Sequence, residues 1–223
     1  MKNITLNWAC IILMTSSIAG CANQTQAGNE PRTLEPVEVN EYQGEKLSSW
    51  KDFRENSIKG PQHIDIADYS LEVSGLVTSP RSFKYEDLIA REKFKKVVKL
   101  NCVEGWSVNI LWEGILLKDL LQELGVQAKA NTVIFYGYDG YSTSFPLDYV
   151  IKNNILLADK MNDEPLRPER GFPFQLVAEQ KWGYKWIKWV TGIELSDNQN
   201  YEGYWEKYGY SKDGDLGKSF IER

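Results

Sequence analysis

Strand-like runs of apolar residues follow one another along the chain from about Leu47 onward. Each run shows either apolar–polar alternation or enrichment in β-branched and aromatic residues, and turn residues separate the runs. The third run contains Asp139-Gly140, which predicts a hairpin turn at that point. The predicted strands lie within "YSLEVSGLV" (69–77), "KKVVKLNC" (95–102), "NTVIFYGYDGYSTSFPL" (131–147), "FPFQLVAEQ" (172–180) and "WIKWVTGIELSD" (186–197).

Helical spacing marks two other segments. In "GILLKDLLQELGV" (114–126) four leucines fall on one face and Gly125 ends the pattern, which predicts a helix. "RSFKYEDLIAREKF" (81–94) predicts a second short helix. The apolar face residues are Leu117, Leu120, Leu121 and Leu124 in the first helix, and Tyr85, Leu88 and Ile89 in the second. Because the strands do not alternate regularly with helices, we expect an α+β fold that is mixed and mostly β.

The N-terminus has the layout of a secretory signal. Only Lys2 is charged before Glu30, and "WACIILMTSSIAGC" (8–21) is too short for a comfortable transmembrane helix, which needs about 20 apolar residues. Its end, Ile-Ala-Gly-Cys, resembles the lipobox of bacterial lipoproteins, in which the cysteine carries the lipid. We therefore expect a signal peptide at 1–20, lipidation at Cys21, a flexible polar tether at 21–46 and one folded domain at 47–223.

The charge balance narrows the choice of partners. The chain has 26 Lys and Arg against 31 Asp and Glu, a formal net charge of −5. Removing residues 1–20 takes away Lys2 alone, so 25 bases against 31 acids leave a charge of −6. A mildly acidic chain argues against nucleic acid as a partner.

The cysteine count leaves one thiol in the predicted domain. Cys10 lies in the predicted signal and Cys21 at its cleavage site, so Cys102 has no partner for a structural disulfide. A buried free cysteine is commonly an apolar filler, but a lone thiol in an oxidising compartment favours a ligand or catalytic role. One cysteine and the single histidine, His63, cannot complete a tetrahedral zinc site. A cysteine–histidine nucleophile pair stays open at this point.

The segment "LNCVEGWSVNILWEGILLKDLL" (100–121) resembles the molybdopterin-binding domain of the sulfite oxidase superfamily, in particular its single-domain, MsrP-like branch. That branch shows Cys-Val-Glu-x-Trp-Ser, then Trp-x-Gly and an amphipathic helix. Three further blocks agree in order: "DFRENSIKGPQHID" (52–65), "YSLEVSGLVTSP" (69–80) and "RGFPFQLVAEQKWGYKWIKWVTGIEL" (170–195). The resemblance covers essentially Trp50 to Leu195.

The resemblance implies a Mo-molybdopterin cofactor and a role for Cys102. In this superfamily the equivalent thiolate binds molybdenum beside the dithiolene sulfurs of one pyranopterin, which makes Cys102 the expected metal ligand and catalytic residue. A soft thiolate suits such a centre, and the metal keeps it ionised. The resemblance further implies cofactor contacts at Asn56, Ser57, Lys59, Gly137, Arg170, Lys185, Trp186, Ile187 and Lys188.

Three departures from the family pattern bear on function. Gln175 replaces a second arginine of the late block, so one anchoring charge is missing. The residues after Leu195 are too few for the dimerisation domain of sulfite oxidases, which implies a monomer served by a separate electron-transfer partner (haem, flavin or quinone-linked). No Arg-Arg precedes the apolar run, whereas most exported relatives carry a twin-arginine signal. Either the export route differs, or the chain is exported unfolded and lacks the cofactor.

The first hypothesis is a lipid-anchored, extracytoplasmic oxidoreductase that transfers an oxo group and two electrons to or from a small substrate. S-oxide reduction is preferred because Trp106, Tyr136 and Tyr138 suggest aromatic, lightly charged surroundings; oxidation of a sulfite-type anion is the alternative chemistry. The rival hypothesis is a cofactor-free lipoprotein that keeps the fold as a binding module or scaffold.

Overall fold

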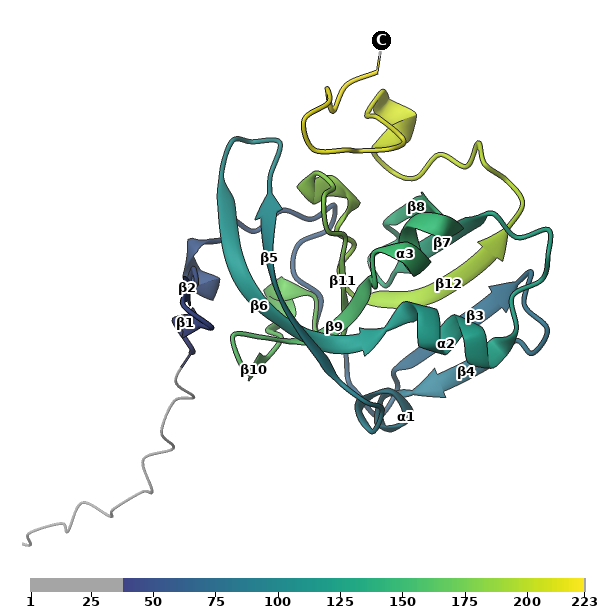
Figure 1. The fold of residues 1–223 in the computed structure, drawn as a ribbon, viewed down its shortest axis with the longest axis horizontal. Coiled ribbons are helices and arrows are strands. Elements are labelled where there is room, and N and C mark those ends of the chain that lie inside the picture. Colours follow the sequence, from purple (N-terminus) through teal and green to yellow (C-terminus); the bar gives the residue numbers. More distant parts are fainter. Residues whose placement is uncertain (1–37, 223) are drawn as a thin grey trace, which may run out of the picture. The chain divides into compact units, whose positions relative to one another are not determined.

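Two five-stranded sheets make up most of the computed structural model, which describes residues 38–222 (Figure 1). The first sheet has the order β10–β9–β6–β5, with β11 also paired to β9. Its strands are β5 (Phe94–Asn101), β6 (Ser107–Leu116), β9 (Leu156–Met161), β10 (Glu164–Pro165) and β11 (Gln175–Val177). All pairs in this sheet are antiparallel.

The second sheet has the order β4–β3–β12–β7–β8. Its strands are β3 (Ser70–Gly75), β4 (Arg81–Lys84), β7 (Thr132–Gly137), β8 (Ser142–Pro146) and β12 (Val190–Ser196). The pairing of β3 with β12 is parallel and joins segments that are far apart in the sequence. Apolar side chains of both sheets form one buried cluster around residues such as Trp112 and Phe135.

Three short α-helices complete the fold: α1 (Tyr85–Ile89), α2 (Leu117–Leu124) and α3 (Leu147–Lys152). The predicted leucine helix is confirmed as α2, since all four leucines are buried and Gly125 ends it at φ +72°. With strands dominating over short helices, the prediction of an α+β, mostly β fold is also confirmed.

Local boundaries differ from the pattern in two places. Residues 81–84, predicted as helix, form the edge strand β4, and the helix begins only at Tyr85. The leucine helix was predicted from Gly114, but residues 114–116 belong to β6, where they pair with β9. A Cβ on Gly114 would lie 2.2 Å from the Leu157 carbonyl oxygen, so this glycine permits close approach of the two strands.

The described chain begins inside the predicted tether. Residues 38–46 include the hairpin of β1 (Glu41–Tyr42) and β2 (Glu45–Lys46). The Glu38 carboxylate accepts hydrogen bonds from the Trp50 backbone N–H (2.6 Å) and the Asn162 amide (2.7 Å). These bonds tie the described end of the predicted tether to the β9–β10 turn.

The predicted signal peptide (1–20), the lipidation site Cys21 and tether residues 21–37 lie outside the described residues. No helix within residues 38–222 has both the length and the apolar character needed to cross a bilayer.

Candidate active site

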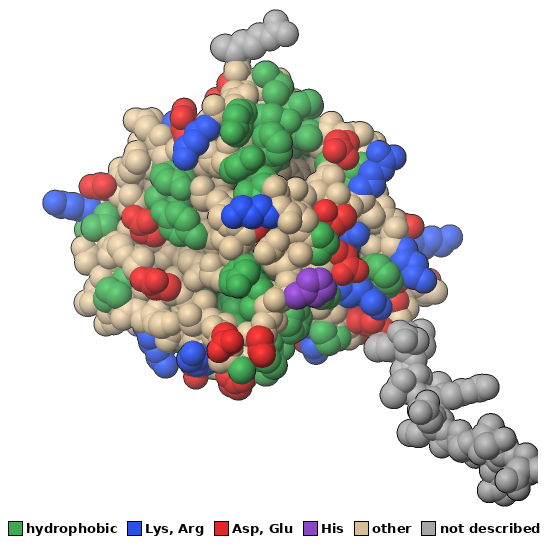
Figure 2. Space-filling view, turned by 180° about the vertical axis from the view of Figure 1, so that it is seen from behind, with side chains coloured by type: hydrophobic (Ala, Val, Ile, Leu, Met, Phe, Trp, Pro, Cys, Tyr) green, Lys and Arg blue, Asp and Glu red, His purple; other side chains and the backbone are tan. Residues whose placement is uncertain are grey.

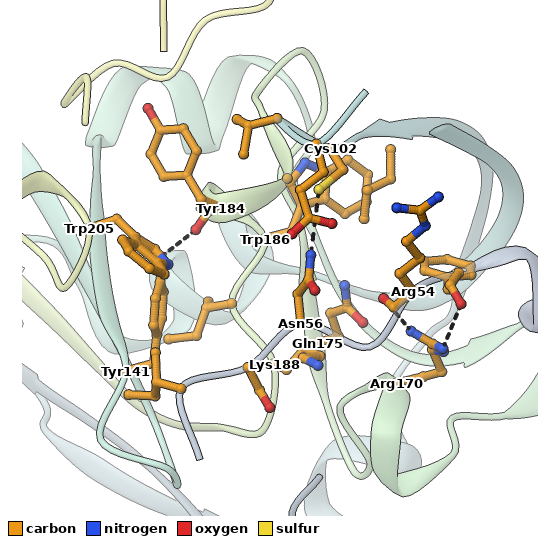
Figure 3. Close-up of a pocket in the computed structure, with 18 of the residues that line it drawn as sticks. Arg54, Asn56, Cys102, Tyr141, Arg170, Gln175, Tyr184, Trp186, Lys188 and Trp205 are labelled. Atoms are coloured by element: carbon orange, nitrogen blue, oxygen red, sulfur yellow. Dashed lines mark hydrogen bonds between the residues drawn. The ribbon is translucent and has the colours of Figure 1, made fainter. Parts of the chain in front are cut away.

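A cavity of about 320 Å³ opens where the end of β5 meets the C-terminal segment of the chain (Figure 3). This volume falls in the range of small-molecule and cofactor pockets, ~300–1,000 Å³. Its lining residues come from segments 53–58, 100–106, 139–141 and 170–189, together with Trp205 and Tyr210. Segments distant in the sequence therefore build one concave site.

Cys102 lies in the wall of this cavity, directly after β5. The chain turns tightly here, because the Cys102 backbone N–H donates to the Trp106 carbonyl (2.9 Å) and Gly105 adopts φ +86°. The Asn56 side-chain amide donates to Cys102 Sγ at 3.7 Å. Burial raises the pKa of the Cys102 thiol, although the Glu104 backbone N–H and the Asn56 amide oppose this shift. A positively charged group bound beside the sulfur would be needed to keep it ionised at neutral pH.

Arg170 brings a buried guanidinium to the cavity. Its Nη atoms donate to the carbonyl oxygens of Arg54 (3.4 Å) and Phe53 (3.3 Å), and the guanidinium stacks 4.6 Å from the Phe53 ring centre. Burial lowers its pKa, and its Nε–H has no acceptor among the described residues. A buried donor without an acceptor is costly unless a bound ligand satisfies it.

Lys188 adds a second, partly enclosed cation. Its ammonium donates to Glu55 Oε1 (2.8 Å) and to the Glu169 carbonyl (3.2 Å), and burial lowers its pKa. Burial also opposes ionisation of Glu55, but the hydrogen bond and charge of Lys188 outweigh it, so the Glu55 pKa is lowered. The carboxylate and the ammonium therefore form an ion pair at the cavity edge.

Of the predicted site residues, seven line the cavity: Asn56, Ser57, Cys102, Arg170, Trp186, Ile187 and Lys188. The Ser57 hydroxyl is buried and makes no hydrogen bond within residues 38–222. Gln175, which replaces the expected arginine, is buried and also lines the cavity.

Three predicted contacts lie elsewhere. The Lys185 ammonium is fully buried against Glu206 Oε1 (2.6 Å) and the Lys212 carbonyl (2.8 Å), so it faces away from the cavity. Gly137 uses its backbone N–H and carbonyl within the β7–β8 hairpin, and a Cβ there would lie 2.9 Å from the Lys188 carbonyl. Lys59 is exposed near Gly140, outside the cavity lining.

The structure also separates groups that the sequence left as candidates. Trp106 lines the cavity, but Tyr136 donates to Glu194 (2.7 Å) and Tyr138 is 59% exposed, both outside the lining. His63 is exposed and is not among the residues around Cys102, so the two do not form a nucleophile pair.

Sequence reasoning missed the aromatic side of the cavity. Tyr141, Tyr184, Trp205 and Tyr210 line it, together with the buried carboxylate of Asp139. The hairpin turn at Asp139-Gly140 and the aromatic run "YEGYWEKYGY" (201–210) were visible signals, but neither shows a ligand-binding spacing.

These features fit a phosphate-bearing pterin with a thiolate-bound metal. A thiol lies in the wall, three cations (Arg54, Arg170 and Lys188) and two unpaired hydrogen-bonding groups (Arg170 Nε and Ser57 Oγ) share the same cavity, and the volume suits an organic cofactor. Among the described residues no three His, Cys, Asp or Glu side chains converge as a metal site. A metal held by Cys102 would thus take its other ligands from a cofactor.

Comparison with known proteins agrees with this geometry. Residues 58–205 match the family model described as the oxidoreductase molybdopterin binding domain. The chain is 35% identical over 156 residues to the uncharacterized oxidoreductase YuiH of Bacillus subtilis, a match that covers 70% of this chain and 78% of that protein. It is 31% identical over 150 residues to a putative protein-methionine-sulfoxide reductase subunit, YedZ1, of Azospira oryzae, covering 67% of this chain and 57% of that protein.

A solved structure is also similar. The sulfane dehydrogenase SoxCD of Paracoccus pantotrophus superposes with a TM-score of 0.62 at 26% identity, covering 69% of this chain and 43% of that chain. The aligned region therefore spans less than two thirds of both the Azospira protein and the SoxCD chain.

Proposed function

The chain belongs to the oxidoreductase molybdopterin-binding domain family, and from this we propose that it is an S-oxide reductase. Family membership makes it a molybdenum-cofactor-dependent oxidoreductase that uses Mo-molybdopterin. When bound, this cofactor supplies a two-electron centre for oxo transfer. The reaction we propose breaks the S=O bond: sulfur gains two electrons from a separate redox protein, and the oxygen leaves as water with two protons.

Different residues of this chain are proposed to bind different parts of the cofactor. Cys102 is the proposed metal ligand, and the Asn56 amide hydrogen-bonds its sulfur. Such outer hydrogen bonds orient a ligand and tune the metal. The unpaired Arg170 Nε and Ser57 Oγ are the proposed donors to the pterin, while Lys188 is the proposed partner of its phosphate.

The observation that carries this proposal is the shared cavity. One concave site contains the only thiol of the described chain, a buried guanidinium with a free N–H, and a lysine at its edge. A scaffold without cofactor would have no use for this combination, because each buried unpaired donor costs stability.

Metal analysis tests the proposal directly. Protein from a host that makes the cofactor is expected to contain close to one equivalent of molybdenum and to release a pterin on denaturation. In Cys102→Ser the affinity for the metal should fall at least about tenfold, because the ligand itself is removed. The circular dichroism spectrum of the variant should stay unchanged. Wild-type protein without molybdenum would favour the cofactor-free scaffold, for which the buried Gln175 in place of an arginine is the supporting feature.

Oxidation of a sulfite-type anion is the second candidate reaction. Arg54, which the sequence reading had not singled out, lines the cavity and is solvent-exposed, so it is available to attract an anion. A dye-coupled assay distinguishes the two reactions. Turnover of sulfite at rates above those of all tested S-oxides would reverse the preference.

The cellular setting is likewise a proposal. The lipobox-like end at Cys21 supports a lipid-anchored, extracytoplasmic protein, and the resemblance to single-domain relatives supports a monomer with a separate haem-, flavin- or quinone-linked partner. Charged side chains of both signs are interspersed on the face shown in Figure 2, which favours neither nucleic acid nor a strongly charged partner.

Metabolic labelling with a fatty acid tests the lipid anchor. The wild-type protein should incorporate the label and Cys21→Ala should not; equal labelling of the wild type and the variant would refute the anchor.

A further inference from the structure

The C-terminal segment, residues 197–222, supplies part of the cavity wall. It follows β12 and contributes Trp205 and Tyr210 to the lining. Residues 206–222 extend beyond the part of the chain that matches the family model. Of the lining residues on the aromatic side, only Tyr210 lies beyond that match, whereas Trp205, Tyr184 and Tyr141 lie within it.

A buried ion pair holds this segment against the rest of the site. Lys185 and Glu206 have side chains 0% and 1% exposed, and Lys185 Nζ lies 2.6 Å from Glu206 Oε1. Thr143 Oγ1 also donates to that oxygen, at 2.9 Å. Lys185 directly follows the cavity residue Tyr184, and Glu206 directly follows the cavity residue Trp205. The ion pair therefore holds Tyr184 and Trp205 in fixed positions relative to each other.

Further bonds tie the same two parts together. Tyr184 donates its hydroxyl to the Ser211 carbonyl (2.6 Å), and the Trp182 backbone N–H donates to Gly214 (2.8 Å). Tyr210 packs edge-on against Tyr184, with ring centres 5.0 Å apart, and against Trp205 at 5.1 Å. The aromatic rings thus form one connected surface that is pre-arranged before any ligand binds.

The two sides of the cavity differ in charge. Tyr141, Tyr184 and Trp205 lie to one side of Cys102 and Asn56, whereas Arg54 and Arg170 lie to the other (Figure 3). On the aromatic side, the Lys185 and Glu206 charges neutralise each other behind the rings. An anion is favoured beside the guanidinium groups and beside Lys188, while flat aromatic faces favour an apolar group.

We propose that the rings of Tyr141, Tyr184, Trp205 and Tyr210 form a subsite for the uncharged apolar substituent of the substrate. This rests on the proposed S-oxide reductase function. The substrate class is a neutral sulfoxide with an aryl group or a similarly large apolar group, bound with its sulfur toward Cys102 and its substituent against Trp205.

The test compares sulfoxides of different size with full-length, molybdenum-loaded enzyme. Trp205→Leu is expected to raise the KM for methyl phenyl sulfoxide about tenfold, the scale of a lost aromatic contact, while KM for dimethyl sulfoxide changes less than about twofold. Trp205→Phe should give a smaller increase in the same direction, which covers the case in which the leucine variant folds poorly. Tyr208→Leu is the matched control, because Tyr208 is 68% exposed in the same segment, does not line the cavity and contacts Trp205 only edge-on, with ring centres 6.0 Å apart.

A non-reducible ligand separates this inference from the reaction itself. Binding of methyl phenyl sulfone to the loaded enzyme, followed by tryptophan fluorescence, should weaken in Trp205→Phe and Trp205→Leu but not in Tyr208→Leu. If wild type binds the sulfone through Trp205 yet reduces no sulfoxide, the subsite stands and the proposed reaction fails. Equal sulfone affinity in all four proteins, or equal KM increases for both sulfoxides, would overturn the subsite.

Discussion

Asp139 has a buried carboxylate beside the cavity, and its surroundings shift the pKa of this carboxylate in opposite directions. Burial raises its pKa, while the Tyr141 backbone N–H, which donates to Oδ1 at 3.0 Å, and the charge of Lys188 lower it; the net pKa is raised. The folded protein therefore retains this proton to higher pH than the unfolded chain does. As pH rises through the interval between the two pKa values, folding stability contributed by the protonated form is lost.

Asp139→Asn should remove this pH-dependent loss, because an amide keeps the acceptor for Tyr141 without a charge. We expect the variant and wild type to melt alike near pH 4 and the variant to melt higher at pH 7, by about 2–4 °C for each kcal/mol gained. Thermal melts of both proteins from a host that does not make the cofactor exclude cofactor effects. A difference in melting temperature that shrinks as pH rises would contradict the argument.

Some residues of the candidate site could be predicted from the sequence, and others could not. Cys102, Asn56, Arg170 and Lys188 could be placed because the motif blocks fix them, and the structure brings them to one cavity. Lys185 belongs to the same motif as Lys188, but its side chain points away from the cavity because its ammonium pairs with the buried carboxylate of Glu206. That partner follows β12, in a segment whose spacing carries no recognisable pattern, so the sequence could not reveal it.

At the scale of elements, the Lys185–Glu206 pair joins the turn at residues 183–185 to the C-terminal segment. Lys185→Met should destabilise the protein by about 3–5 kcal/mol, because it leaves Glu206 charged and buried without its partner. Glu206 Oε2 already has no hydrogen bond among the described residues, which adds to this cost.

The double variant Lys185→Met with Glu206→Leu should recover most of that loss, since replacing both members of a buried pair by apolar groups is often close to neutral. Urea unfolding of the two single variants and the double variant measures the coupling. Strictly additive losses would show that the two side chains do not act as a pair.

Elements with a strong internal period were the predictable ones. The four leucines of α2 and the alternation in β3 determine those elements locally, and the turn at Asp139-Gly140 determines the β7–β8 hairpin. By contrast, side chains on both faces of β9 are buried (five of its six residues), so "LLADKM" shows no apolar–polar alternation. The 81–84 edge strand was misread because it runs directly into a helix.

For the whole molecule, the cofactor would act as an internal link between distant segments. The cavity collects residues from 53–58 to Tyr210, and a ligand that binds only the folded state stabilises all of them together. At a concentration of 100 times its Kd this amounts to about 2.7 kcal/mol.

Removal of the cofactor should therefore lower the melting temperature by roughly 5–10 °C, given about 2–4 °C for each kcal/mol in a protein of this size. Differential scanning calorimetry of protein from hosts with and without cofactor synthesis gives the comparison. Cys102→Ser should show a smaller difference between the two hosts, because tenfold weaker binding reduces the stabilisation at the same concentration to about 1.4 kcal/mol. A wild-type protein that melts identically from both would argue against cofactor binding.

The parallel pairing of β3 with β12 sets an order of events during biosynthesis. The strand that completes the second sheet, and the rings that follow it, leave the ribosome after every other part of the cavity. A nascent chain therefore has no complete cofactor site until Tyr210 has been synthesised. If the chain is exported as an unfolded polypeptide, the cofactor must be inserted after export; if the chain is exported as a folded protein, the cofactor must be inserted before export.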